Sequence, residues 1–320
     1  MILYHALARL FALVAVPALL VAAAFSAKYR AGLGQRFGRL PAVPRPRPGA
    51  RRVWLHCASV GEVQTAAALV EGLLADPRID LVLSTMTPTG QALARTKYAG
   101  RCPVVFWPVE LARAVRRTMD AIRPELLLIL ETELWPAVLD VARARAVPVA
   151  ILSARVSDSA FAKYRIAALF FAPLLRGITL FAVQTEEYAR RLRALGVAGE
   201  RVRVTGNLKF DLGLDRDALR AKPSVVDAAW PSPGPLFVAA STHEGEEDAA
   251  LAAFRAARER VPGLRMVLAP RHVERADAVA RLLADARERE RLGAAGRGVV
   301  AANAGAARRH LDLVTELLGG

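Results

Sequence analysis

The sequence predicts an α/β protein, because short apolar segments alternate with segments of helical periodicity along most of its length. The apolar segments are rich in Val, Leu and Ile, and the stretches between them have the amphipathic spacing of helices. This alternation is typical of a parallel sheet with helices on both faces. Of the 320 residues, 54% are hydrophobic and 23% charged, a composition that supports a packed core and argues against disorder.

The first domain contains most of the expected elements. We expect its strands over residues 53–59, 81–86, 104–108, 126–131, 149–154 and 180–185. The helices between them are expected over residues 63–75, 112–122, 137–145, 161–175 and 186–195. A Pro-rich linker at Pro41–Gly49 precedes this domain.

A second unit is expected to begin near residues 202–207, before a polar, Pro-rich passage. It repeats the β-α-β pattern with strands at 236–241 and 266–270 around a helix at 246–260, and only helices are expected after residue 274. Two strands make an incomplete Rossmann-like half. The predicted divisions are 1–27, a membrane anchor; 28–52, a basic segment and linker; 53–205, the first Rossmann-like domain; and 206–320, a truncated second domain with C-terminal helices.

An apolar stretch from Ala6 to Phe25 is long enough to cross a bilayer, and Arg9 is its only charge. We interpret it as a membrane helix, with a cleaved signal peptide and monotopic insertion as alternatives. The flank that follows has no acidic residue among its basic ones, which are Lys28, Arg30, Arg36, Arg39, Arg45, Arg47, Arg51 and Arg52. The positive-inside rule therefore predicts an inner-membrane protein with a cytoplasmic main body, and the flank suits an anionic membrane surface.

The formal net charge of +15 indicates an anionic partner, such as a nucleic acid, a nucleotide or an acidic membrane surface. No nucleic-acid-binding motif is present and many basic residues flank the apolar segment, so we do not expect nucleic-acid binding. Cys57 and Cys102 form neither a disulfide framework nor a metal-ligand spacing. We therefore expect a reducing compartment and no metal.

The turn after the first strand reads Ser59-Val60-Gly61-Glu62. Ligands of open α/β sheets bind beyond the carboxyl ends of the strands, where Glu62 could take a proton from a hydroxyl. Gly61 would permit a tight turn. The alternative is a structural role for Glu62, as an acidic residue in the first turn of a helix.

A pair of carboxylates, Glu131 and Glu133, lies at the end of the expected strand at 126–131. Alternation along an extended chain would point Glu131 and Glu133 the same way and create an acidic pocket. The structural alternative is that Glu131 bonds a neighbouring backbone group or pairs with Arg155. Both interpretations stay open at this point.

A third group of candidates lies at and beyond the domain junction and could bind an anion. It contains cations and a predicted helix N-terminus, namely Lys209, Ser241, Thr242, His243, Glu246, Arg271 and His272. The alternatives are a capping box formed by Ser241 with Glu244, and solvated surface charges at Arg271 and His272.

Taken in order, the motifs resemble those of the 3-deoxy-D-manno-octulosonic acid (Kdo) transferases, which attach Kdo to lipid A precursors. The matching segments cover most of residues 1–275 and read KYRAGLGQRFGR, HCASVGEV, TMTPTGQ, ETELWP, SARVS, QTEEYARRLRALG, VTGNLKFD, STHEGEE and APRH. The resemblance implies a two-domain GT-B fold, an inverting transfer of Kdo from CMP-Kdo to lipid IVA, and no cofactor or metal. It also implies that Glu62 is the catalytic base, that residues 53–205 bind the acceptor and that the later candidates bind CMP.

Two departures from the family pattern stand out. Ala137 follows the ETELWP motif where Asn is common, and the segment after Arg275 passes quickly into the family's final helices. The simplest interpretation is an internal deletion in the second domain that removes part of the donor site. A catalytically impaired, membrane-bound protein that binds an anionic lipid or a protein partner is therefore the alternative function.

Overall fold

The computed structural model describes residues 25, 30–211, 234–240, 246–269 and 305–319. The chain forms two compact units, the first made of residues 1–213 and 303–320 and the second of residues 214–302.

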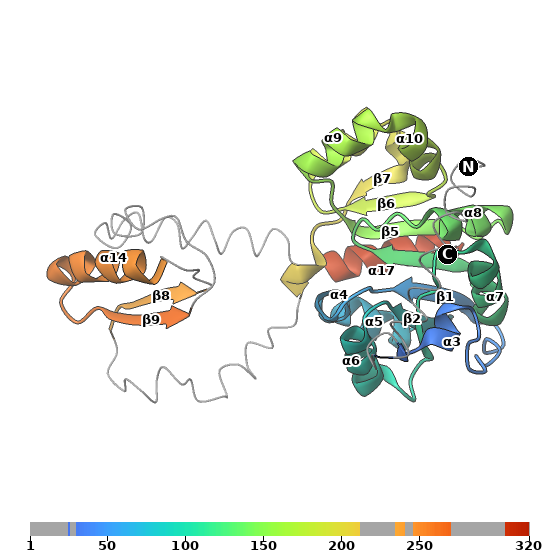
Figure 1. Cartoon of the computed structure of the whole chain (residues 1–320), viewed down its shortest axis with the longest axis horizontal. Helices are drawn as coiled ribbons and strands as arrows, with labels where there is room; N and C mark the ends of the chain where they lie inside the picture. The colour runs from blue at the N-terminus through green and yellow to red at the C-terminus, as the bar shows by residue number, and fades with distance from the viewer. Residues whose placement is uncertain (1–24, 26–29, 212–233, 241–245, 270–304, 320) are drawn as a thin grey trace. The chain divides into compact units, whose positions relative to one another are not determined.

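The first unit is built on a seven-stranded parallel sheet with the strand order β3-β2-β1-β4-β5-β6-β7 (Figure 1). Its strands are β1 (Arg51–His56), β2 (Ile79–Thr85), β3 (Val104–Phe106), β4 (Leu126–Leu130), β5 (Val149–Ala154), β6 (Leu180–Val183) and β7 (Val202–Val204). The order reverses at β1 and β4, and such switch points are where open α/β sheets bind ligands.

Helices cover both faces of this sheet. They are α3 (Leu33–Arg36), α4 (Val60–Thr65), α5 (Ala67–Ala75), α6 (Pro88–Tyr98), α7 (Ala112–Ile122), α8 (Pro136–Ala144), α9 (Asp158–Ile166), α10 (Ala168–Arg176), α11 (Glu186–Ala194) and α17 (Ala306–Leu317), with 3₁₀ turns η1 (Gly199–Arg201) and η2 (Leu208–Asp211). Alternate strand residues serve the two faces. Trp54 and Leu127 pack with α7, α8, α10 and α11, whereas Leu55 and Leu128 pack with α4, α5, α6 and α17.

The second unit contains a parallel pair of strands, β8 (Leu236–Ala240) and β9 (Arg265–Ala269), with α14 (Glu246–Arg260). Its described core is small and consists of Phe237, Ala250, Ala257 and Leu264 with partly buried neighbours. The β-α-β pattern expected for this region is present.

The sequence located most elements, and three of them, β5, α7 and α14, have the predicted boundaries. The first strand ends at His56 rather than Ser59, because Ser59 is the N-cap of α4. The single helix expected over 161–175 is two helices, which meet at Ala167.

Two features of the domain junction differ from expectation. Strand β7 pairs in parallel with β6, so residues 202–204 complete the first sheet rather than start the second unit. Helix α17 packs on α5 and η2 of the first unit, although the sequence placed it with the second domain. Its buried face accounts for this position, since it consists of Ala306, Ala307, His310, Leu313 and Val314.

The predicted anchor at 6–25 lies, except for Phe25, outside the described residues. Among the helices that the structure describes, none is long and apolar enough to span a bilayer. Part of the basic flank is engaged within the first unit. The Arg36 guanidinium stacks over Phe106 at 4.5 Å, and Arg52 is buried with Nη2 2.7 Å from Asp80 Oδ2.

Candidate active site

Glu62 lies just past the carboxyl end of β1, in the first turn of α4. The Ser59 hydroxyl caps this helix by accepting from the Glu62 N–H at 3.4 Å. The Glu62 carboxylate accepts from the Ala58 N–H at 2.9 Å and from the Ser59 hydroxyl at 3.1 Å. Glu62 thus lies in the first turn of a helix, as the structural interpretation expects, and is also half-buried at the sheet edge where ligands bind.

Gly61 does not make the tight turn expected from the sequence. Its φ is not in the left-handed region, and a Cβ atom added there would meet only Ser59 Oγ, at 3.9 Å. The glycine that shapes this turn is Gly90 in α6. A Cβ atom on Gly90 would lie 3.2 Å from the Ser59 carbonyl carbon and 3.3 Å from the Val60 nitrogen, so glycine lets α6 approach the start of α4.

Glu131 and Glu133 follow β4, the strand next to β1. They do not continue the strand, because β4 ends at Leu130 and Glu131 adopts a φ of 56°. Strained backbone of this kind is costly for a non-glycine residue and concentrates at functional sites. The predicted alternation along the strand is therefore wrong in its geometry, yet both carboxylates act on Glu62.

Burial and these two neighbours change the acidity of Glu62. The pKa of Glu62 is raised from 4.5 to about 7. Desolvation is the largest cause and the negative charges of Glu133 and Glu131 add to it, whereas the hydrogen bonds from Ala58 and Ser59 oppose it. A carboxyl with a pKa near neutrality is half-ionised at physiological pH, which suits a general base.

Lys209 pairs with Glu131. Its Nζ lies 3.1 Å from Glu131 Oε1, so the partner of Glu131 is Lys209 rather than the Arg155 suggested by the sequence. Lys209 belongs to η2, which follows β7, and thus lies within the first unit. Arg155 is exposed, and its backbone N–H and carbonyl bond the Thr132 hydroxyl.

Glu133 contacts a buried aromatic layer. His56, fully buried, stacks on Trp107 with ring centroids 3.8 Å apart, and its Nε2 lies 3.4 Å from Glu133 Oε2. This distance is long for a hydrogen bond, so the contact is mainly electrostatic. Desolvation lowers the pKa of His56, with opposing contributions from Glu133 and the Ser84 carbonyl. The Trp135 Nε1–H donates to the same Glu133 oxygen at 3.2 Å.

The structure therefore brings Ser59, Glu62, Glu131, Glu133 and Lys209 together in the first unit. Five other predicted residues, Ser241, Thr242, His243, Arg271 and His272, lie outside the described residues. Glu246 is the first residue of α14 in the second unit.

Two histidines of the first unit, His56 and His310, were not predicted from the sequence as candidates. His56 lies within the HCASVGEV motif, which was the available signal. His310 lies among small and apolar residues at helical spacing, a pattern that predicts burial but no contact partner.

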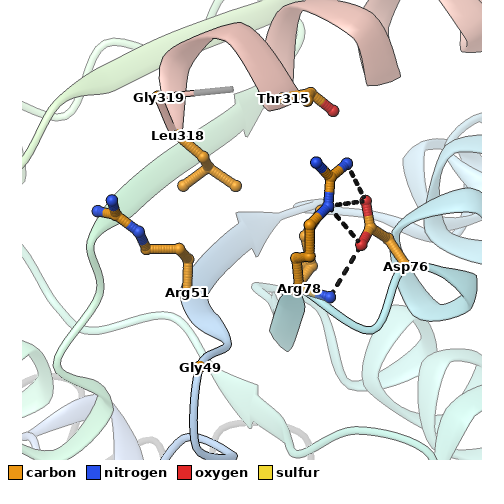
Figure 2. Close-up of a pocket in the computed structure, with 8 residues that line it drawn as sticks. Gly49, Arg51, Asp76, Arg78, Thr315, Leu318 and Gly319 are labelled. Atoms are coloured by element: carbon orange, nitrogen blue, oxygen red, sulfur yellow. Dashed lines mark hydrogen bonds and ion pairs between the residues drawn. The ribbon is translucent and has the colours of Figure 1, made fainter.

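A pocket of about 180 Å³ lies at the opposite, amino-terminal edge of the sheet (Figure 2). It is lined by the start of β1, the turn before β2 and the end of α17, including Arg51, Arg78 and Leu318. Arg78 is bonded to Asp76, as Figure 2 shows, and Arg51 pairs with Glu125 at 3.1 Å. Its arginines thus have acidic partners, in contrast to the clustered carboxylates around Glu62.

In the described ranges no group of three or more His, Cys, Asp or Glu side chains is arranged to hold a metal ion. Cys57 and Cys102 are buried free thiols, and burial raises the pKa of both.

The sequence profile of the 3-deoxy-D-manno-octulosonic-acid transferase (kdotransferase) family matches residues 31–212, which contain the whole cluster around Glu62. The chain belongs to this family. Kdo transferases of Haemophilus influenzae and Bordetella pertussis are similar to it, at 33% identity over 81% of this chain and 34% over 77%. The aligned regions cover 60% and 58% of those relatives, so the chain spans well under two thirds of their length.

Solved structures support the α/β fold. A UDP-GlcNAc 2-epimerase from Neisseria meningitidis, bound to UDP-GlcNAc, has a TM-score of 0.51 at 14% identity and covers 73% of this chain and 69% of its own. A UDP-N-acetylglucosamine 2-epimerase from Listeria monocytogenes has a TM-score of 0.52 at 12% identity, with 73% and 72% coverage. At these identities the likeness concerns the fold alone.

Proposed function

We propose that the protein is an inverting glycosyltransferase that moves Kdo from CMP-Kdo to lipid IVA, a lipid A precursor, in lipopolysaccharide biosynthesis. The observation that carries the proposal is the half-buried Glu62, whose neighbours are two further carboxylates. Membership of the kdotransferase family supports the choice of sugar.

In the proposed reaction, an acceptor hydroxyl attacks the anomeric carbon of Kdo while the bond to the CMP phosphate oxygen breaks. The ionised Glu62 takes the hydroxyl proton, and CMP leaves with the bonding electrons. This chemistry requires one base and stabilisation of the leaving phosphate, and it uses no cofactor. The desolvated environment that raises the pKa of Glu62 also makes its carboxylate a stronger base.

For the donor, we propose that CMP binds through Ser241, Thr242, His243, Glu246, Arg271 and His272 of a second domain in a GT-B arrangement. The support for this assignment is the resemblance of the STHEGEE and APRH segments to the family pattern. Arg155, Ser59 and Gly61 are proposed to support the acceptor side. Arginine and helix N-terminal N–H groups are suitable partners for a phosphate.

We also propose that residues 6–25 anchor the protein in the bacterial inner membrane with its main body in the cytoplasm. The apolar stretch and its basic flank support this localisation. An anchor would keep Glu62 near an acceptor that stays in the membrane. Alkaline extraction of membranes tests it, since an anchored chain stays in the pellet, whereas release into the supernatant would contradict the anchor.

The proposed activity is tested by incubating membranes that contain the full chain with CMP-Kdo and tetra-acylated lipid A precursor, and measuring CMP release and Kdo-lipid formation. We expect both with the wild type, and a loss of about 10²- to 10⁴-fold with Glu62→Gln, the usual contribution of a general base. Gln64→Ala is the matched control, because Gln64 is an exposed residue of the same helix.

Absence of both products from wild-type membranes would refute the transferase proposal. Retained binding of the lipid precursor in such membranes would favour the catalytically impaired lipid-binding protein. Equal activity of Glu62→Gln and wild type would refute the role of Glu62 alone.

A further inference from the structure

We propose that His310, on the C-terminal helix α17, is a positioning residue that holds Lys209 against Glu131 and thereby adjusts the base Glu62. The inference rests on the proposed function and deepens it. It starts from a fully buried histidine that the transfer chemistry does not use.

The hydrogen bonds of His310 define its protonation. Its Nε2 accepts from the Ser153 backbone N–H at 2.9 Å, so this nitrogen carries no proton. Its Nδ1 lies 2.7 Å from the Ala306 carbonyl oxygen and therefore donates to it. Burial lowers the pKa of His310 to about 4, which keeps the ring neutral at the pH at which Glu62 titrates.

Ser153 needs this acceptor. It has a φ of 52° and lies at the irregularity where the pairing of β5 with β6 shifts register between Ile151 and Ala154. A buried N–H group without a partner would be costly. His310 supplies the partner from outside the sheet and stabilises an unfavourable backbone conformation at the carboxyl end of β5.

Hydrogen bonds connect Ser153 to Lys209. The Ser153 carbonyl accepts from Gln184 Nε2 at 2.9 Å, and Gln184 Oε1 accepts from Asn207 Nδ2 at 3.2 Å. Asn207 Oδ1 then accepts from the Lys209 backbone N–H at 3.0 Å. The chain of contacts ends at the ion pair between Lys209 and Glu131.

Helix α17 also holds the same segment directly, and His310 Nε2 itself lies 3.3 Å from the Thr205 hydroxyl oxygen. Asp211 accepts from the backbone N–H groups of Gly305 and Ala307, at 2.7 and 2.5 Å, and the Arg309 Nε–H donates to the Thr205 carbonyl at 2.6 Å. Residues 205–211 are therefore fastened to α17 at both ends, with Lys209 between these contacts.

The consequence for Glu62 is electrostatic. The charged groups around it are Glu131 and Glu133, whose charges raise its pKa, and Lys209, which pairs with Glu131. The nearby Cys57 thiol is neutral, because burial raises its pKa well above the ordinary value. Loosening of Lys209 leaves the charge of Glu131 uncompensated, so the ionised form of Glu62 becomes less favourable. The acidic limb of the pH profile of the transfer rate then moves to higher pH.

The test compares His310→Leu, which removes the acceptor, with His310→Gln, whose Oε1 can replace Nε2. Two measurements are made on the full chain: the pH profile of CMP release, and hydrogen exchange of peptides that cover residues 205–211. We expect His310→Leu to move the acidic limb upward by about half a pH unit to one unit and to speed exchange. His310→Gln should restore both.

A second variant, outside the core, keeps the test interpretable if His310→Leu does not fold. Arg309→Met removes the contact with Thr205 and should shift both readouts in the same direction. Arg308→Met is the matched control, because Arg308 is exposed on the same helix and pairs with Asp312. We expect it to match the wild type.

Three results would overturn the proposal. The first is that neither His310→Leu nor Arg309→Met changes the acidic limb of the pH profile or the hydrogen exchange of residues 205–211. The second is that His310→Leu and His310→Gln shift the acidic limb equally, and the third is that Arg308→Met shifts it as much as Arg309→Met. If the wild type releases no CMP, the proposed function fails separately. Hydrogen exchange then decides whether α17 holds residues 205–211.

Discussion

The two ends of the seven-stranded sheet carry opposite arrangements of charge. At the amino-terminal end, Arg51 pairs with Glu125 and Arg52 with Asp80, so each cation has an acidic neighbour. At the carboxyl-terminal end, three carboxylates gather with Lys209 as the paired cation, and the pKa of one of them, Glu62, is raised by burial and by the other two. Paired charges stabilise the fold at one end, whereas crowded like charges at the other end raise the pKa of Glu62, the proposed base.

Helix α17 connects these two ends. Its first turn contacts Asp211 beside the carboxylates, and Leu318, just past its last turn, lines the arginine pocket of Figure 2. A helix of this length spans about 18 Å. Variants at the two ends of the sheet therefore also test how far α17 stabilises each end.

The largest effect on stability is expected at the amino-terminal end, from Asp80→Ala. This change leaves the Arg52 guanidinium, 1% exposed, without its carboxylate partner, and breaking a buried ion pair in this way costs about 3 to 5 kcal/mol. Chemical denaturation measures it. Glu71→Ala, which breaks an exposed pair with Arg101, should cost less than about 1 kcal/mol. Equal losses of unfolding free energy in the two variants would show that the buried ion pair stabilises the fold no more than the exposed one.

An intermediate effect is expected at the carboxyl-terminal end, where two groups have opposite pH dependence. Glu62 has a raised pKa, so its contribution is present below pH 4.5 and is lost as the pH rises through about 7. His310 has a lowered pKa, so its contribution is present above pH 6.5 and is lost as the pH falls through about 4. Over most of this range the two offset each other.

Variants separate these contributions. Relative to the wild type, Glu62→Gln should lose more stability on acidification from pH 7.5 to 4, and His310→Gln should lose less, each by about 2 kcal/mol after allowance for partial exposure and relaxation. Denaturation midpoints across this range measure both. Parallel curves for the three proteins would contradict the two shifted pKa values.

The smallest effect is expected from Arg78→Ala at the rim of the arginine pocket. Arg78 is exposed and bonded to Asp76, its neighbour two residues earlier, so its removal should leave the melting temperature unchanged. A clear drop in melting temperature would mean that the amino-terminal end depends on its surface pairs as well as on Arg52.

The sequence predicted the sheet well because hydrophobic periodicity reports burial directly. It also placed Glu62 just beyond the carboxyl end of the first strand, and the catalytic role of this residue stays a prediction. It did not predict that Lys209 reaches Glu131, or that His310 reaches Ser153 from 157 positions further along the chain. Such contacts depend on the tertiary path of the chain, which periodicity does not encode.

The local backbone geometry could likewise not be predicted from the sequence. Glu131 and Ser153 adopt positive φ values that their residue types disfavour, and nothing in the surrounding residues signals this. These conformations can be explained only when the contacts of Glu131 with Lys209 and of Ser153 with His310 are known. The C-terminal helix was assigned to the second domain for a related reason, because α17 joins the first unit through contacts between residues far apart in the sequence.

The central claim is that crowding and burial at the carboxyl-terminal end bring Glu62 to a pKa near neutrality. A direct measurement is carbon-13 NMR titration of the protein labelled at glutamate Cδ, with the Glu62 signal assigned by its absence in Glu62→Gln. We expect that signal to titrate at about pH 7. Titration near pH 4.5, as for an ordinary glutamate, would contradict the account.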